Sequence, residues 1–310
     1  GGILQRDLES ASPSLDATST SATTTTTATE SPSATSSVAT STASTTPLIT
    51  DTTPPSLSFS ISPCAQSLSP DGCLLATTTL TLAWSSLDSD LDHYILECSV
   101  TGITCTNFSF ASTTATSTTY MATTTASYIF KAKAIDTSGN ESEQKTISPE
   151  VSLRPVVINE IAWAGTGGSP VTNKDEWIEL YNTTSKKVSL SNMILNSPSN
   201  HSFKINLSGT IDAHDFYLIE RTDDTVITDI PADLTTTFGK GLSNDGEQLS
   251  LMMGSTTIDT TPPLGACSRW CGGTMAGDYK TMERYDPMSS GQESANWSDG
   301  GDVVAFGANA

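Results

Sequence analysis

Apolar and polar residues alternate in short runs along most of the chain after residue 55. The clearest run is Val156-Val-Ile-Asn-Glu-Ile-Ala-Trp163, and Asp175-Glu-Trp-Ile-Glu-Leu-Tyr-Asn182 follows after a stretch rich in glycine and serine. A period of two residues is typical of strands that bury one face. Because no long run has the helical period, the pattern predicts an all-β protein.

Residues 51–153 contain several alternating runs separated by turn-forming residues. The apolar positions are Leu80, Leu82 and Trp84, then Tyr94, Leu96 and Cys98, then Tyr128, Phe130, Ala132 and Ala134, with Lys131 and Lys133 on the opposite face of the last run. About 100 residues of short strands and frequent turns are typical of a β-sandwich. We therefore expect Trp84, Tyr94 and Tyr128 to lie in its core.

Residues 154–310 predict a second β-sandwich, with Trp163 and Trp177 in its core. The predicted strands are Val156–Trp163, Glu176–Asn182, Val188–Leu195, Phe216–Glu220, Leu249–Met253, Thr256–Asp259 and Thr281–Tyr285. Asn244-Asp245-Gly246 between apolar residues predicts a hairpin turn. The segment Ser152-Leu-Arg-Pro155 predicts a hinge before this unit.

The N-terminal segment has a different composition. Residues 10–46 are mostly serine, threonine and alanine, with almost no charge and few larger apolar side chains. Such a segment buries too little apolar surface to offset the entropy lost on folding. The sequence thus predicts a disordered stalk or linker at residues 1–50, followed by sandwiches at 51–153 and 154–310.

The charge balance narrows the possible partners. The 310 residues include 14 lysines and arginines against 34 aspartates and glutamates, a formal net charge of −20. Nucleic-acid binding needs clustered basic residues, so this balance argues against it. No run of about 18 apolar residues occurs, so no transmembrane helix is predicted. Since the chain begins Gly1-Gly2 without methionine, we expect a fragment or a processed product.

Six cysteines fall into three local pairs: Cys64/Cys73, Cys98/Cys105 and Cys267/Cys271. An even number of closely spaced cysteines predicts disulfides formed in an oxidising compartment. Free thiols and metal ligation are the alternatives, although His93, His201 and His214 stand in unrelated contexts.

The spacing of Cys98 and Cys105 allows a local test of the pairing. A two-residue turn at Thr101-Gly102 would place these two cysteines directly opposite each other, within disulfide distance. A longer turn would shift the register, and Cys98 would then pair with Cys73.

The first predicted sandwich resembles a fibronectin type III domain. The resemblance rests on Asp51-Thr-Thr-Pro-Pro55, Leu82-Ala-Trp84, Tyr94 and Tyr128-Ile-Phe-Lys-Ala-Lys-Ala-Ile-Asp-Thr-Ser-Gly-Asn140. These residues are packing positions and turns, so the resemblance implies a fold and no chemistry. The insertion between Cys64 and Cys73 departs from the family pattern, and a disulfide that closes it would explain the departure.

The second predicted sandwich resembles the lamin tail domain, as found in prokaryotic surface and secreted proteins. The matching residues are Val157-Ile-Asn-Glu-Ile161, Asp175-Glu-Trp-Ile-Glu-Leu-Tyr-Asn182, Val188-Ser-Leu190, Phe216-Tyr-Leu-Ile-Glu220, Leu242-Ser-Asn-Asp-Gly-Glu-Gln-Leu-Ser-Leu251, Ile258-Asp259, Met282-Glu-Arg-Tyr-Asp-Pro287 and Asn296-Trp297. The resemblance implies an immunoglobulin-like sandwich that tethers or recognises, with no catalytic residues to transfer. The insertion Cys267-Ser-Arg-Trp-Cys271 departs from the family pattern and predicts a small disulfide-closed loop.

Two groups of acidic residues are candidates for chemistry. Glu160, Glu176 and Glu179 lie on neighbouring predicted strands, and paired carboxylates are what glycosidases use. A buried carboxylate requires a cation or hydrogen-bond donors, so we interpret the group as structural, with Arg284 paired to Glu160 or Glu179.

The second group is the alternating trio Asp88, Asp90 and Asp92. Calcium binds oxygen ligands of this kind, although the trio lacks the spacing of an EF-hand loop. A solvated acidic loop is the alternative interpretation.

These observations predict a non-catalytic secreted or cell-surface protein, with no cofactor, that adheres to, tethers or recognises a protein or glycan. The alternative is the accessory C-terminal part of a larger secreted hydrolase or nuclease. Neither hypothesis identifies the ligand or the oligomeric state.

Overall fold

The computed structural model describes residues 50–68, 72–100, 103–106, 108, 110–166, 174–198, 201–227 and 230–301. Their regular structure is β-strand apart from one short 3-10 helix, η1 (Ser294–Asn296). The prediction of an all-β fold is therefore confirmed. The predicted stalk lies outside the described residues, and contacts between residues separate Gly1–Ile49 from Thr50–Ala310.

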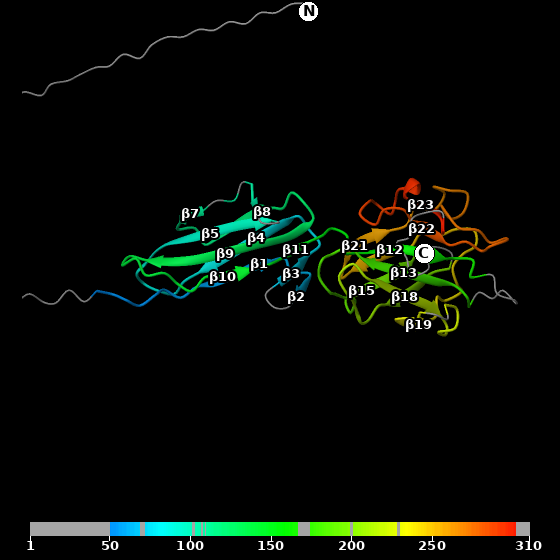
Figure 1. The fold of residues 1–310 in the computed structure, drawn as a ribbon, viewed down its shortest axis with the longest axis horizontal. Coiled ribbons are helices and arrows are strands. Elements are labelled where there is room, and N and C mark those ends of the chain that lie inside the picture. The colour runs from blue at the N-terminus through cyan, green and yellow to red at the C-terminus, as the bar shows by residue number, and fades with distance from the viewer. Residues whose placement is uncertain are drawn as a thin grey trace, which may run out of the picture. The chain divides into compact units, whose positions relative to one another are not determined.

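The strands before residue 152 form two sheets (Figure 1). They are β1 (Ser58–Ser62), β2 (Gln66–Leu68), β3 (Gly72–Leu75), β4 (Thr79–Ser85), β5 (Leu91–Val100), β6 (Ile103–Thr104), β7 (Phe110–Thr113), β8 (Ser117–Met121), β9 (Ala126–Asp136), β10 (Lys145–Ile147) and β11 (Glu150–Val151). One sheet has the order β1-β4-β8. The other has the order β2-β3-β11-β9-β5-β6, with β10 paired to β9 and β7 to β5.

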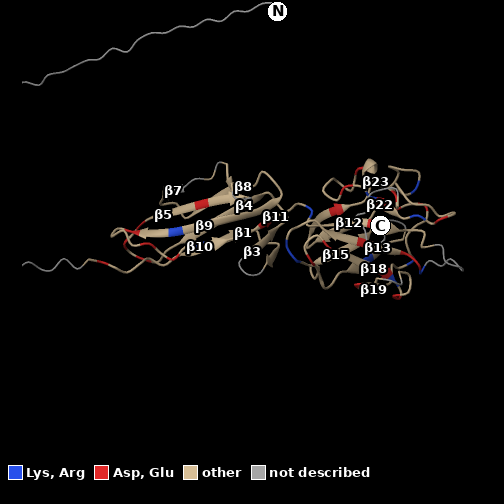
Figure 2. Ribbon diagram, in the orientation of Figure 1, with Lys and Arg blue, Asp and Glu red and all other residues tan. Residues whose placement is uncertain are grey.

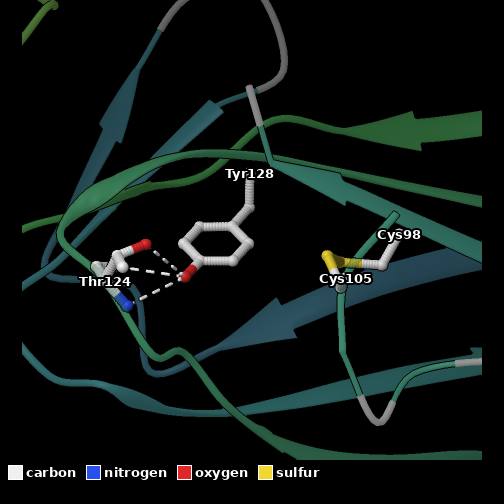
Figure 3. The surroundings of a disulfide bond; sticks show 4 residues. All are labelled: Cys98, Cys105, Thr124 and Tyr128. Atoms are coloured by element: carbon white, nitrogen blue, oxygen red, sulfur yellow. Dashed lines mark hydrogen bonds between the residues drawn. A yellow bond between two sulfur atoms is a disulfide. The ribbon is translucent and has the colours of Figure 1, made fainter. Parts of the chain in front are cut away.

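Aromatic side chains fill the space between these two sheets. Trp84 and Tyr94 contact each other edge to face, with ring centroids 6.4 Å apart. Both are buried, as is Tyr128. The Tyr128 hydroxyl donates to the Thr124 carbonyl at 3.1 Å and accepts from the Thr124 backbone N–H at 3.3 Å (Figure 3). Since burial of a tyrosine hydroxyl requires such partners, the turn before β9 is fixed by the core.

The strands after residue 155 form three further sheets. They are β12 (Val156–Ala162), β13 (Trp177–Asn182), β14 (Val188–Ser189), β15 (Met193–Ser197), β16 (Phe203–Asn206), β17 (Thr210–Ile211), β18 (Phe216–Arg221), β19 (Leu234–Thr236), β20 (Ser250–Met253), β21 (Thr256–Thr260), β22 (Met282–Arg284) and β23 (Trp297–Asp299). A six-stranded sheet has the order β19-β18-β13-β12-β22-β23 and a four-stranded sheet the order β16-β15-β20-β21; β14 and β17 form a two-stranded sheet.

The six-stranded sheet buries side chains on both faces. Its inner face carries Ile158, Ile161, Ile178, Leu180 and Met282, which pack into the main core of this unit together with Leu195 and Leu251 of the four-stranded sheet. Its outer face carries a smaller cluster of Ala162, Trp177, Leu218 and Ile227. Burial on both faces explains why β12 has no exposed position, although its sequence alternates.

The predicted strands agree with the observed ones within about one residue at most ends. Val188–Leu195 is the exception, because it divides into β14 and β15 at a turn. The Met193 N–H donates to the Leu190 carbonyl at 2.8 Å, and this turn redirects the chain from β17 to a different pair of partner strands.

The predicted hairpin at Asn244-Asp245-Gly246 is also only partly correct. The turn forms, with the Gly246 N–H donating to the Ser243 carbonyl at 3.0 Å, but strands do not flank it directly. The Ser243 N–H donates to the Glu247 carboxylate at 2.8 Å, so it is not used for a hydrogen bond between two strands.

Candidate functional site

Three glutamates form a row across the outer face of the six-stranded sheet. The strand register places Glu160 opposite Glu179 on one side and opposite Glu283 on the other. Directly opposed residues of an antiparallel pair point to the same face of a sheet. All three are buried, so the row is an unusually acidic strip of protein interior.

Each glutamate in the row accepts a hydrogen bond from a residue close to it in the fold. The Thr281 hydroxyl donates to Glu160 at 2.5 Å, the Asn159 amide donates to Glu179 at 2.9 Å, and the Gly301 N–H donates to Glu283 at 3.2 Å. Burial raises the pKa of Glu160 to about 7; the Thr281 hydroxyl opposes this shift and the Glu283 charge adds to it. Glu160 therefore keeps its proton at pH values where an exposed glutamate is already ionised.

Arg284 does not pair with this row, and the predicted ion pair with Glu160 or Glu179 is wrong. Successive residues of a strand point to opposite faces, so Arg284 points away from the face that carries Glu283. It pairs instead with Asp259 of β21, at 2.7 and 2.9 Å from the two carboxylate oxygens. Neither side chain of this pair reaches solvent.

A second buried ion pair joins Glu176 to Arg221 at 3.0 Å. The Leu242 N–H also donates to Glu176 at 2.9 Å, and Arg221 donates to the Gly239 carbonyl at 3.3 Å. Burial raises the pKa of Glu176 to about 7, against the Leu242 hydrogen bond and the Arg221 charge.

The sequence offered one signal for this second pair. Arg221 directly follows the predicted strand Phe216–Glu220. The two glycines of Gly239-Lys-Gly241 lie further along the chain, in a later loop. Gly241 has a φ of +96°, and a Cβ atom there would lie 2.3 Å from the Arg221 Nη1 atom. The glycine is therefore needed for the loop to pass over the ion pair.

The aspartates predicted as a calcium site do not converge as a trio. Asp88 accepts hydrogen bonds from Ser56 and Ser86, and Asp92 contacts His93. The structure instead brings Asp90 together with two aspartates that are distant in sequence.

These two aspartates are Asp51 and Asp136, and one oxygen of each of the three lies within 4.8 Å of the others. The carboxyl of Asp51, above all, raises the pKa of Asp90. Asp136 already accepts the Ser138 and Asn140 N–H groups at 2.9 and 2.8 Å. Carboxylate oxygens at this spacing are chemically suited to a hard cation, and the site could hold one.

The three predicted disulfides are present. The Cα–Cα distances are 5.6 Å for Cys64–Cys73, 5.4 Å for Cys98–Cys105 and 5.3 Å for Cys267–Cys271. The register pairs Val100 with Ile103, as a tight turn requires, although its predicted tip at Thr101-Gly102 lies outside the described residues. Cys98, Cys105 and Tyr128 belong to the same core cluster (Figure 3).

Acidic positions outnumber basic ones in the part of the chain that the structure describes. Asp and Glu positions recur in strands and loops of the described chain, while Lys and Arg positions are fewer (Figure 2). Two of the cations, Arg221 and Arg284, are buried in the ion pairs above. In the described residues, no helix is both long and apolar enough to cross a membrane.

Comparison with known proteins identifies one family. No curated protein matches the chain. A DUF4876 family protein from Bacteroides thetaiotaomicron VPI-5482 is 9% identical, over 70% of this chain and 90% of that chain, with a TM-score of 0.31. The BSP domain of a biofilm associated protein is 9% identical, over 69% of this chain and 30% of that chain, with a TM-score of 0.20.

The sequence identities and TM-scores of these two structures are too low to indicate a function for this chain. The fibronectin type III resemblance of the first unit stays a prediction. The family model of the Lamin Tail Domain matches residues 150–262, so this segment is similar to that family.

Proposed function

We propose that this chain is a non-catalytic modular protein of the extracellular space or the cell surface, which tethers or recognises a protein or glycan. The lamin tail domain match supports a modular role for the second unit. Three disulfides support an oxidising compartment, because such bonds persist mainly outside the cytosol.

The observation that carries the proposal is the state of the buried charged groups. Glu176 and Asp259 each form an ion pair with an arginine that also binds backbone carbonyls. Glu160 accepts from Thr281 on the next strand. Groups held in this way by neighbouring strands are typical of structural networks, whereas catalytic carboxylates face a cleft where substrate can bind.

Recognition is expected at loops, because loops tolerate variation and carry most binding residues. In the second unit the exposed large apolar side chains lie in loops. Leu264 is 58% exposed and Met275 is 40% exposed, both in the connection between β21 and β22. We propose this connection as the recognition surface.

The modular role also requires a domain organisation. We propose a stalk at residues 1–50, a fibronectin type III-like sandwich at 51–153 and a lamin tail-like sandwich at 154–310. The sheets support the second boundary, since in the described residues no sheet combines strands from before residue 152 with strands from after residue 155.

Binding of the chain to arrays of glycans and of extracellular proteins tests the function. We expect saturable binding that the double substitution Leu264→Ser and Met275→Ser abolishes. Leu87→Ser is the matched control, because Leu87 is 97% exposed but lies in the first unit. Glu160→Gln should leave binding unchanged. Turnover of an array component by the parent, lost in Glu160→Gln, would overturn the proposal.

A further inference from the structure

One tryptophan in the connection between β21 and β22, Trp270, stacks on Trp163 from another part of the chain. Trp270 lies between Cys267 and Cys271, and its indole is parallel to that of Trp163, with centroids 6.2 Å apart and 12° between the planes. Trp163 directly follows β12, a central strand of the six-stranded sheet. This aromatic contact is one of the attachments of the disulfide-closed loop to the core.

Hydrogen bonds fix both indoles from opposite sides. Trp270 donates its indole N–H to the Ser243 carbonyl at 2.7 Å, and Trp163 donates to the Gly272 carbonyl at 2.9 Å. A Cβ atom on Gly272 would lie 2.2 Å from the Ser298 carbonyl oxygen, so the backbone after Cys271 is packed closely against β23. The C-terminal side of the loop is therefore well anchored.

The N-terminal side of the loop is more exposed, although the Arg269 backbone lies close to Gly246, where a Cβ atom would be 2.7 Å from the Arg269 carbonyl oxygen. Residues 263–266, 268 and 269 are exposed, and Cys267 is only half-buried. The Cys267–Cys271 disulfide joins this exposed side to Cys271 and so closes the loop that contains Trp270. By contrast, Cys98 and Cys105 are 4% and 5% exposed and are shielded from any reagent in solution.

We propose that the Cys267–Cys271 disulfide is a reducible latch that holds Trp270 against Trp163. A dithiol reductant attacks one sulfur atom as the thiolate, forms a mixed disulfide, and releases the other cysteine. Its second thiol then displaces the first cysteine. Two electrons and two protons pass to the protein, which gains two thiols, and the reductant leaves as a disulfide.

Opening the latch frees the exposed side of the loop while the sheets stay intact. Without the covalent link, the backbone of residues 263–269 gains conformational freedom, which favours departure of Trp270 from the stack. The position of Leu264 and Arg269 then changes relative to the core. This inference concerns the state of the loop and does not depend on which partner the protein binds.

Controlled reduction of the full chain tests the proposal. The protein is treated with increasing dithiothreitol under native conditions, the free thiols are alkylated, and peptide mapping assigns them. Tryptophan emission and far-ultraviolet circular dichroism are recorded at each step. We expect alkylation at Cys267 and Cys271 with a shift of emission to longer wavelength, while Cys98–Cys105 and the β-sheet signal persist.

Three variants assign the signal to the latch. Trp270→Phe should remove the emission shift on reduction, whereas Trp177→Phe, which alters the outer-face cluster, should retain it. The double variant Cys267→Ser and Cys271→Ser should show the reduced emission without reductant. Full alkylation of Cys267 and Cys271 without an emission change would overturn the proposal, as would a bond that resists reduction until the sheets unfold.

Discussion

Arg284 of β22 binds Asp259 of β21 through both terminal nitrogens, and neither side chain is exposed. Arg284 also donates to the Ile158 carbonyl at 2.7 Å, and Asp259 accepts the Ile158 N–H at 2.9 Å. The pair thereby connects three strands from two sheets. Since two-point hydrogen bonding between charged groups is both strong and geometrically specific, this contact fixes how the sheets meet.

Removing one member of this pair should be strongly destabilising. Arg284→Met leaves the Asp259 charge buried without its cation, and we expect a loss of about 3–5 kcal/mol in the free energy of unfolding. Urea denaturation measures it. The double variant Arg284→Met and Asp259→Leu removes both charges and should lose less than the single variant. A single variant as stable as the parent would refute this role.

Glu160 should make the protein less stable as the pH rises. Its pKa is about 7 in the folded protein and near 4.5 when unfolded. The stabilisation is fully present below pH 4.5 and is lost as the pH rises through 7, because the buried carboxyl must then ionise. The shift corresponds to about 3 kcal/mol.

Glu160→Gln should remove this contribution and still accept the Thr281 hydrogen bond. Denaturation at pH 5 and pH 8 should show the variant gaining stability relative to the parent at the higher pH. Glu176→Gln is the matched control: its pKa is similarly raised, but at pH 8 the substitution leaves Arg221 without its carboxylate and should destabilise the protein. An equal pH dependence in parent and Glu160→Gln would contradict the assignment.

Gly241→Ala should be among the most damaging substitutions in the loops. The positive φ costs about 1–3 kcal/mol for alanine, and the new methyl group would also press on Arg221 and Glu176. Gly265→Ala is the control, because it has a similar φ of +90° but nothing within 4 Å of the new Cβ atom. Thermal denaturation should show a clearly larger fall in Tm for Gly241→Ala, and equal falls would be evidence against the close approach.

Asp90→Asn should raise the melting temperature slightly at neutral pH. The substitution removes one of three carboxylates that crowd together, with Asp51 and Asp136 as its neighbours. Calorimetry in the absence and presence of calcium chloride measures the change. If calcium leaves the Tm of the parent unchanged, the cluster does not bind calcium. If Asp90→Asn has a lower Tm than the parent without calcium, the three carboxylates do not destabilise the fold by repelling one another.

The sequence was sufficient for most of the longer strands and for the burial of the large aromatic residues, because both follow from short-range alternation. It missed short strands such as β16, β19 and β23. Trp84, Tyr94, Tyr128 and Trp163 lie in the predicted cores, whereas Trp177 is buried in the cluster on the outer face of the six-stranded sheet. The cysteine pairs could also be predicted from the sequence, because the two cysteines of each pair are fewer than ten residues apart.

The charged contacts could not be predicted in the same way. Arg284 was assigned to the wrong carboxylates because its face of β22 depends on a register with β12 that composition does not reveal. Asp51 joins Asp90 and Asp136 across long separations in the chain, and Arg221 meets Glu176 only after the sheet has formed. Such contacts depend on which residues of neighbouring strands lie opposite each other. A shift of that register by one residue would turn every side chain of the strand to the other face of the sheet.

The buried glutamate row also has a thermodynamic consequence. Between pH 4.5 and about 7 the folded chain keeps a proton on Glu160 that the unfolded chain releases into solution. The heat of unfolding should therefore depend on the buffer that takes up this proton. Folding makes the protein a weaker polyanion than its formal charge of −20 implies, by neutralising a carboxylate in its interior.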